Sequence, residues 1–148
     1  MKYSVEIEIN LPIARVIELF DNPDNLQKWQ PGLLSFEHLS GTPGQPGAKS
    51  RLTLRMGRGK MIMTETVTVR NLPDEFSGTY EVKNVFNIVK NRFIALSENK
   101  TKYISESEFQ FKGFMRIIAF FMPGAFKKQS QKYLQLFKEF AEKEGMAK

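Results

Sequence analysis

The stretch that decides the fold lies at the C-terminal end, where residues 113–143 read GFMRIIAFFMPGAFKKQSQKYLQLFKEFAEK. Apolar side chains recur there at helical spacing, and lysines occupy many of the positions between them. This pattern predicts a long amphipathic helix with one apolar face. Pro123-Gly124 should kink or interrupt the helix, because proline lacks a backbone donor and clashes with the preceding turn.

Upstream of this helix the hydrophobic period is two. Residues 2–10 alternate, with Tyr3, Val5 and Ile7 on one side, which is typical of a half-buried strand. Six further strands are expected at about 33–40, 48–56, 61–71, 75–83, 85–97 and 102–112. The links between them are short and rich in turn residues, so consecutive strands should pair as an antiparallel meander.

Two short helices are predicted between the first strand and the second. Pro12 opens one of them, and Asp21-Asn22-Pro23 ends it. A second helical turn runs from Pro23 to Trp29. One strand, two short helices, six strands and a long helix make an α+β two-layer domain, because the sheet must bury one face against the helix. A chain of 148 residues fits one domain, which we expect to span residues 1–148.

Composition excludes several classes of site. The chain has no cysteine and one histidine, so we expect no disulfide, no metal site and no cofactor. The net charge is +6, but no stacked-aromatic signature of nucleic-acid binding accompanies it. Neither a signal peptide nor a membrane-spanning run is evident, and we expect a cytoplasmic protein.

Several segments together resemble the START / Bet v-like (SRPBCC) superfamily, in particular its polyketide cyclase/dehydratase-like bacterial branch. The segments are VEIEINLP at residues 5–12, VIELFDNP at 16–23, LQKWQPG at 26–32, and Gly47 before a strand. The resemblance covers nearly the whole chain. It implies a helix-grip fold, with a curved seven-stranded antiparallel sheet around the long helix and a deep cavity between them. Such folds host carriers and enzymes alike, so the resemblance predicts the fold better than the function.

The residues expected to face this cavity are apolar with a few polar points, which is typical of small-molecule pockets. In the 61–71 strand, Met63 and Glu65 share a face with Val67 and Val69. An ordinary filled core is the alternative. The cavity candidates are Trp29, Phe36, His38, Leu54, Met63, Glu65, Tyr80, Ser107, Phe109 and Phe121.

Three of these residues are candidates for chemistry. Desolvation should raise the pKa of Glu65 in an apolar wall, which suits a general acid or base. His38 could pair with Glu65 or Tyr80 in proton transfer. The alternatives are that Glu65 pairs with a basic residue at the rim, and that His38 is structural or exposed.

Two aromatic features carry open alternatives. Similarity to the family implies that Trp29 lies near the pocket entrance, and a packing anchor is the other interpretation. The segment 120–128 combines aromatic rings with lysines, which suits a peripheral membrane contact. The alternative is that its rings are buried over the cavity. The membrane-contact candidates are Phe120, Phe126, Lys127 and Lys128.

Three functions therefore remain open. The leading hypothesis is binding or carrying of a small lipophilic molecule, such as a lipid, polyketide or isoprenoid, with no catalysis. The second is a cyclase-, dehydratase- or hydrolase-like enzyme that uses the same cavity. The third is a module that docks on a membrane or a protein partner. The sequence indicates neither the ligand nor the oligomeric state.

Overall fold

The computed structural model describes residues 1–146, which form seven strands, four α-helices and one 3-10 turn. The strands are β1 (Lys2–Ile9), β2 (Leu33–Ser40), β3 (Lys49–Met56), β4 (Gly59–Asn71), β5 (Glu75–Val82), β6 (Val85–Ser97) and β7 (Lys100–Phe111). The helices are α1 (Ile13–Phe20), η1 (Pro23–Asn25), α2 (Leu26–Trp29), α3 (Phe114–Phe121) and α4 (Pro123–Met146).

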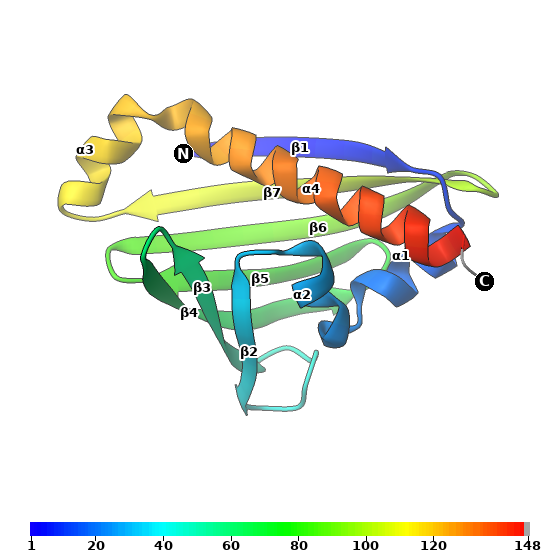
Figure 1. Cartoon of the computed structure of the whole chain (residues 1–148), viewed down its shortest axis with the longest axis horizontal. Coiled ribbons are helices and arrows are strands. Elements are labelled where there is room, and N and C mark those ends of the chain that lie inside the picture. The colour runs from blue at the N-terminus through cyan, green and yellow to red at the C-terminus, as the bar shows by residue number, and fades with distance from the viewer. Residues whose placement is uncertain (147–148) are drawn as a thin grey trace.

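All seven strands form one antiparallel sheet in the order β1-β7-β6-β5-β4-β3-β2. Strands β2 to β7 follow one another as a meander, and β1 returns to pair with β7. Helix α4 crosses the β1 and β7 side of the sheet, while α1 and α2 lie near its C-terminal end (Figure 1). The predicted α+β helix-grip architecture is confirmed, with strand limits close to those expected.

The C-terminal helix is interrupted, as the Pro123-Gly124 pair predicted. Helix α3 ends at Phe121, and α4 begins at Pro123 instead of near Gly113. Proline at the first position of a helix loses no intrahelical hydrogen bond, so the second helix can start there. As a result α3 projects beyond the end of β7 and leads directly into α4, away from α1 and α2 (Figure 1).

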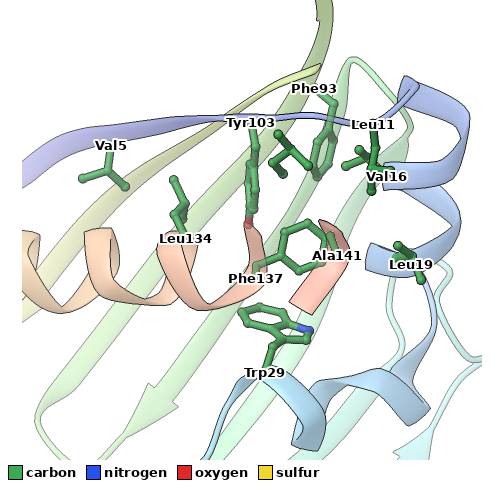
Figure 2. Packing of buried hydrophobic residues seen from close by; sticks show 11 residues of the cluster. Val5, Leu11, Val16, Leu19, Trp29, Phe93, Tyr103, Leu134, Phe137 and Ala141 are labelled. Carbon is green, nitrogen blue, oxygen red and sulfur yellow. The ribbon is translucent and has the colours of Figure 1, made fainter. Parts of the chain in front are cut away.

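The tightly packed core lies at the end of the sheet covered by α1, α2 and the last turns of α4. Phe137 of α4 is fully buried, and its ring centre lies 5.1 Å from Trp29, 5.7 Å from Tyr103 and 5.9 Å from Phe20. The ring sits between the sheet and α2 (Figure 2). These edge-to-face contacts are a preferred arrangement of aromatic rings. Phe137 thus joins the sheet to the helices.

A β-bulge corrects one predicted face. The register of β4 against β5 shifts between Val67 and Val69, so Val69 is exposed rather than internal. The bulge places Arg70 opposite Phe76. The Arg70 guanidinium donates to both carboxylate oxygens of Asp21, at 2.8 and 2.5 Å, and lies 5.8 Å from the Phe76 ring centre. This ion pair ties the end of α1 to the sheet.

Candidate functional site

A row of polar side chains crosses the inner face of the sheet, which is otherwise largely apolar. Register pairing places Asn87 opposite Tyr80, Tyr80 opposite Glu65, and Glu65 opposite Ser50. His38 follows opposite Ser50 at the edge of the sheet. Directly opposed residues in an antiparallel sheet lie about 4.5–5.5 Å apart at Cβ, so neighbours in this line can interact. We call Asn87, Tyr80, Glu65, Ser50 and His38 the polar row.

The centre of the row is a hydrogen-bonded carboxyl–phenol pair. Burial raises the pKa of Glu65 above its ordinary value of 4.5, and the hydrogen bond from Tyr80 partly opposes this. The pKa of Tyr80 is raised well above its ordinary value by burial and by the neighbouring Glu65 carboxylate. Burial thus disfavours the charged form of both groups.

A second polar pair lies next to this row. The Tyr103 hydroxyl donates a 2.8 Å hydrogen bond to Asn91 Oδ1, and both residues are buried. Burial raises the pKa of Tyr103. The Asn91 amide in turn donates to the Phe76 carbonyl at 3.3 Å. This pair is satisfied within the protein, so it shapes the wall rather than offering free donors.

The inner face is less covered towards α3 than at the packed end. Glu65, Tyr80, Asn87, Phe109 and Phe111 are half-buried, although they lie within the sheet. An open hollow of about 310 Å³ lies at this end, lined by Met1, Phe109, Phe111, Arg116, Ala119 and Phe120. A second hollow of about 350 Å³ lies beside the β5–β6 turn. The first hollow is therefore bounded by the apolar end of the inner face, and neither hollow is lined by Glu65 or Tyr80.

Most predicted cavity residues lie on this wall. Phe36, Leu54 and Met63 are half-buried at the β2–β3–β4 end, and Phe36 and Met63 both oppose Leu52. Ser107 and Phe109 share the inner face of β7 with Tyr103, and Ser107 is buried. The face assigned to Glu65 and Tyr80 by alternation is therefore the inner one. Ligand contact by these residues stays a prediction.

Two predicted site residues lie elsewhere than expected. Phe121 does not line the cavity, because it points outward from α3 with 75% of its surface exposed. His38 is exposed, and its Nε2 bonds the Gly41 carbonyl at 2.7 Å. Ser50 stands between His38 and Glu65 in the row, so the two form no proton-transfer pair. His38 is exposed because β2 is the edge strand, and a bulge follows it near Ser40, where β2 ends.

Trp29 is placed as a packing anchor. It is 7% exposed and packs on Phe137, at the closed end of the sheet rather than at the hollow beside α3. Its indole Nε1 is buried and has no hydrogen-bond partner among the described residues. The anchor interpretation therefore fits the geometry better than ligand stacking at an entrance.

The membrane-contact candidates separate into two groups. Phe120 is 79% exposed, and Lys127 and Lys128 are exposed at the start of α4. Phe126 instead turns inward, with its ring centre 4.9 Å from Phe109 and 5.3 Å from Phe111. Phe126 is therefore part of the wall and not of the outer surface.

Sequence reasoning missed three polar members of the inner face. The strands that carry Ser50, Asn87 and Asn91 were predicted close to their observed limits. The alternation of side chains along those strands already indicated the face on which these residues lie. What the sequence lacked was the register that places Ser50 beside Glu65 and Asn87 beside Tyr80. Within residues 1–146 no cluster of three or more carboxylate or histidine side chains suits a metal ion.

Comparisons with known proteins agree with this architecture. Residues 1–142 match the family described as polyketide cyclase / dehydrase and lipid transport. The chain belongs to this family. A search of curated proteins found no match to the sequence. The family match confirms the resemblance drawn from the segments between residues 5 and 47.

Solved structures share the fold of this polyketide cyclase / dehydrase family member. The Zhui aromatase/cyclase from Streptomyces sp. R1128 has a TM-score of 0.82 at 12% identity, over 96% of this chain and 93% of that one. A conserved protein from Geobacillus kaustophilus has a TM-score of 0.78 at 18% identity, over 97% and 96%. Norcoclaurine synthase from Thalictrum flavum, in complex with dopamine and hydroxybenzaldehyde, has 0.67 at 14%, over 94% and 87%. At these identities the likeness concerns the fold alone.

Family membership supports a role in hydrophobic ligand binding or in cyclase-type chemistry. No described helix has the length and hydrophobicity needed to span a bilayer.

Proposed function

We propose that this family member binds a small hydrophobic molecule against the inner face of the sheet and orients its polar end at Glu65 and Tyr80. The observation that carries the proposal is this directly opposed carboxyl–phenol pair, set in an apolar and incompletely covered wall. The Tyr103–Asn91 pair, in contrast, is buried.

The apolar part of the ligand would lie over Phe109, Phe111 and Met63. Removing apolar surface from water contributes about 25 cal/mol per Å², so this contact would supply most of the affinity. Methionine adapts to irregular shapes, and Met63 beside Leu52 suits a ligand of variable outline.

The polar end of the ligand should be uncharged. Among inner-face positions of the described strands, Arg70 carries the fixed positive charge, and Asp21 already neutralises it. A bound carboxylate would therefore lack a cation next to Glu65. A hydroxyl or carbonyl group, as found in polyketides and isoprenoid alcohols or quinones, fits the donor and acceptor capacity of the pair.

Native mass spectrometry of the purified protein, followed by denaturing extraction, tests the proposal first. A co-purifying lipophilic species near one-to-one stoichiometry would support it and would give the ligand class. If the protein is empty and neutral lipophilic probes such as Nile red do not bind saturably, the proposal fails.

Matched variants locate the site. Glu65→Gln and Tyr80→Phe should weaken binding of the extracted species by a few fold, because each removes one polar contact worth about 0.5–1.5 kcal/mol. Glu81→Gln is the control, since Glu81 adjoins Tyr80 in β5 but is exposed. Equal effects of Glu65→Gln and Glu81→Gln would exclude the assigned site.

Acid–base catalysis in the same face is the second candidate function. The hydrogen-bonded Glu65–Tyr80 pair favours it, because a neutral phenol can donate to a ligand carbonyl while the carboxyl group exchanges a proton. Under this alternative, Glu65→Gln abolishes turnover of a candidate substrate while binding and the melting temperature survive. Binding without turnover in the wild-type protein would favour the carrier.

A further inference from the structure

Helix α3 carries its apolar residues on the side that faces solvent. Phe114, Ile117, Phe120 and Phe121 follow the spacing of one helical stripe, and all four are exposed. Ala119, on the opposite side, is buried. A surface helix normally presents polar side chains outward, so the outward stripe of α3 is unpartnered.

Basic residues flank this stripe along the chain. Lys112 precedes α3, Arg116 lies on it, and Lys127, Lys128 and Lys132 follow on α4. From Gln110 to Lys138 the sequence contains no acidic residue. None of the five side chains forms an ion pair with another residue in the range 1–146. The segment that carries the apolar stripe is therefore positively charged, and we call these five basic residues its rim.

The same helix borders the open hollow of the ligand-binding wall. Arg116, Ala119 and Phe120 line it from α3, and Phe109 and Phe111 line it from β7. Helix α3 projects at this end of the molecule (Figure 1). A surface that met the α3 stripe would therefore also lie beside the mouth of the hollow.

We propose that α3 and the first turns of α4 dock on an anionic lipid bilayer, with the stripe inserted at the level of the head groups. Interfacial helices combine an apolar face with lysine or arginine in this way. Contact with a second copy of the chain is disfavoured, because a symmetric interface would bring two like-charged rims together. Docking does not depend on the ligand proposed above, and it goes beyond that function.

Vesicle flotation with the full chain tests docking directly. The protein should float with vesicles of phosphatidylcholine mixed with phosphatidylglycerol, and much less with phosphatidylcholine alone. Raising the salt from about 0.1 M to about 1 M shortens the screening length from roughly 10 Å to roughly 3 Å, so binding should fall. Equal retention on both vesicle types, or none on either, would overturn the proposal.

Variants separate the stripe from the rim. Phe120→Asp combined with Phe121→Asp should lower vesicle affinity about tenfold or more, since both rings would no longer insert. Lys127→Gln and Lys128→Gln should each lower it about fivefold, from about 1 kcal/mol per basic side chain near an anionic surface. Thermal melts should show that all variants remain folded.

A double variant on the sheet is the matched control. Met56 and Ile62 are each 61% exposed and lie outside α3. Met56→Asp with Ile62→Asp should leave vesicle binding unchanged, and a loss equal to that of the α3 variant would overturn the assigned surface. Sedimentation velocity tests whether the stripe instead binds a second copy of the chain. If the protein is a dimer that Phe120→Asp dissociates, and if it does not bind vesicles, the stripe is a dimer interface and the bilayer proposal is wrong.

Discussion

The two ends of the inner face use the same kinds of side chain but differ in what covers them. At one end Phe137 fills the space between Tyr103, Trp29 and Phe20, and it is fully buried. At the other end Phe109 and Phe111 stack on each other at 5.6 Å, and both stay half-buried beside an open hollow. The difference arises from the helices, since α4 packs along the first end while α3 projects past the second (Figure 1).

This contrast indicates that the two ends of the sheet have different roles, one in stability and one in exposing apolar surface. The packed end buries its aromatic rings, whereas the open end keeps apolar surface and the Glu65–Tyr80 pair only partly covered. Under the proposed function, this partly covered surface is the part that receives the ligand. Native proteins are stable by only about 5–15 kcal/mol, so such surface is tolerable only where the rest of the core compensates. The predictions below test whether the two ends can be separated in this way.

Truncation of the central rings should show the largest difference. Phe137→Ala leaves a cavity in close-packed surroundings and should cost about 3–5 kcal/mol of unfolding free energy. Phe111→Ala removes a half-buried ring and should cost about 1 kcal/mol. Urea denaturation of both variants measures the difference. Similar losses would mean that the open end is as tightly packed as the core, which contradicts the difference in roles.

The Tyr103–Asn91 hydrogen bond should show the next largest effect. Tyr103→Phe keeps the ring between Phe93 and Phe137 but leaves the buried Asn91 Oδ1 without its donor. The expected loss is about 1–3 kcal/mol, the cost of an unsatisfied buried acceptor. Tyr80→Phe, at the half-buried Glu65 pair, should cost less in the same urea titration. A larger loss for Tyr80→Phe than for Tyr103→Phe would mean that the polar row, and not the Tyr103–Asn91 pair, stabilises the fold.

The sequence predicted those features of the fold and the site that depend on neighbouring residues in the chain. Period-two alternation assigned Glu65, Tyr80 and Phe109 to one face, because successive strand residues point to opposite sides. The bulge between Val67 and Val69 could not be predicted, because the extra residue in β4 leaves the apolar alternation up to Val69 unchanged. Beyond the bulge the faces are exchanged, so that Arg70 rather than Val69 lies on the inner face. Local periodicity thus predicted the wall but not its irregular positions.

Longer-range features were less accessible. Helical spacing places Phe121 on a stripe, yet nothing in that spacing tells whether the stripe meets the sheet or solvent. His38 has the parity of an inner-face residue, but it occupies an edge strand, bonds the Gly41 carbonyl and stays exposed. Both outcomes depend on which neighbouring elements cover a residue, and that is a property of the whole fold.

The pH dependence of the unfolding free energy should show a smaller effect than the two ring variants, and it reports on Glu65 in the polar row. Below the ordinary carboxyl pKa of 4.5, Glu65 is protonated in the folded and unfolded states alike. As pH rises, the unfolded chain loses this proton first, because burial raises the folded pKa, so stability should fall across that interval. Glu65→Gln should flatten this decline as the pH rises above 4.5.

Urea titrations at several pH values measure this slope. Glu81→Gln, at an exposed position in β5, is the matched control and should keep the wild-type slope. A wild-type slope that Glu65→Gln leaves unchanged would mean that the carboxyl is not desolvated in the folded protein, and the orienting role proposed for it would lose its basis.

The smallest effect on stability is expected where the exposed apolar surface is greatest. Phe120 packs against Phe121 at 5.4 Å, but both rings are mostly exposed, so little of their surface is buried by folding. Phe120→Ser and Phe121→Ser should therefore change the unfolding free energy by less than about 0.5 kcal/mol each. Thermal melts in the absence of lipid measure this. A loss above about 2 kcal/mol would mean that these rings are buried in solution, and α3 would then belong to the packed core rather than to the open end. Unchanged stability would instead mean that the two rings are not needed by the fold, which is what a docking surface requires.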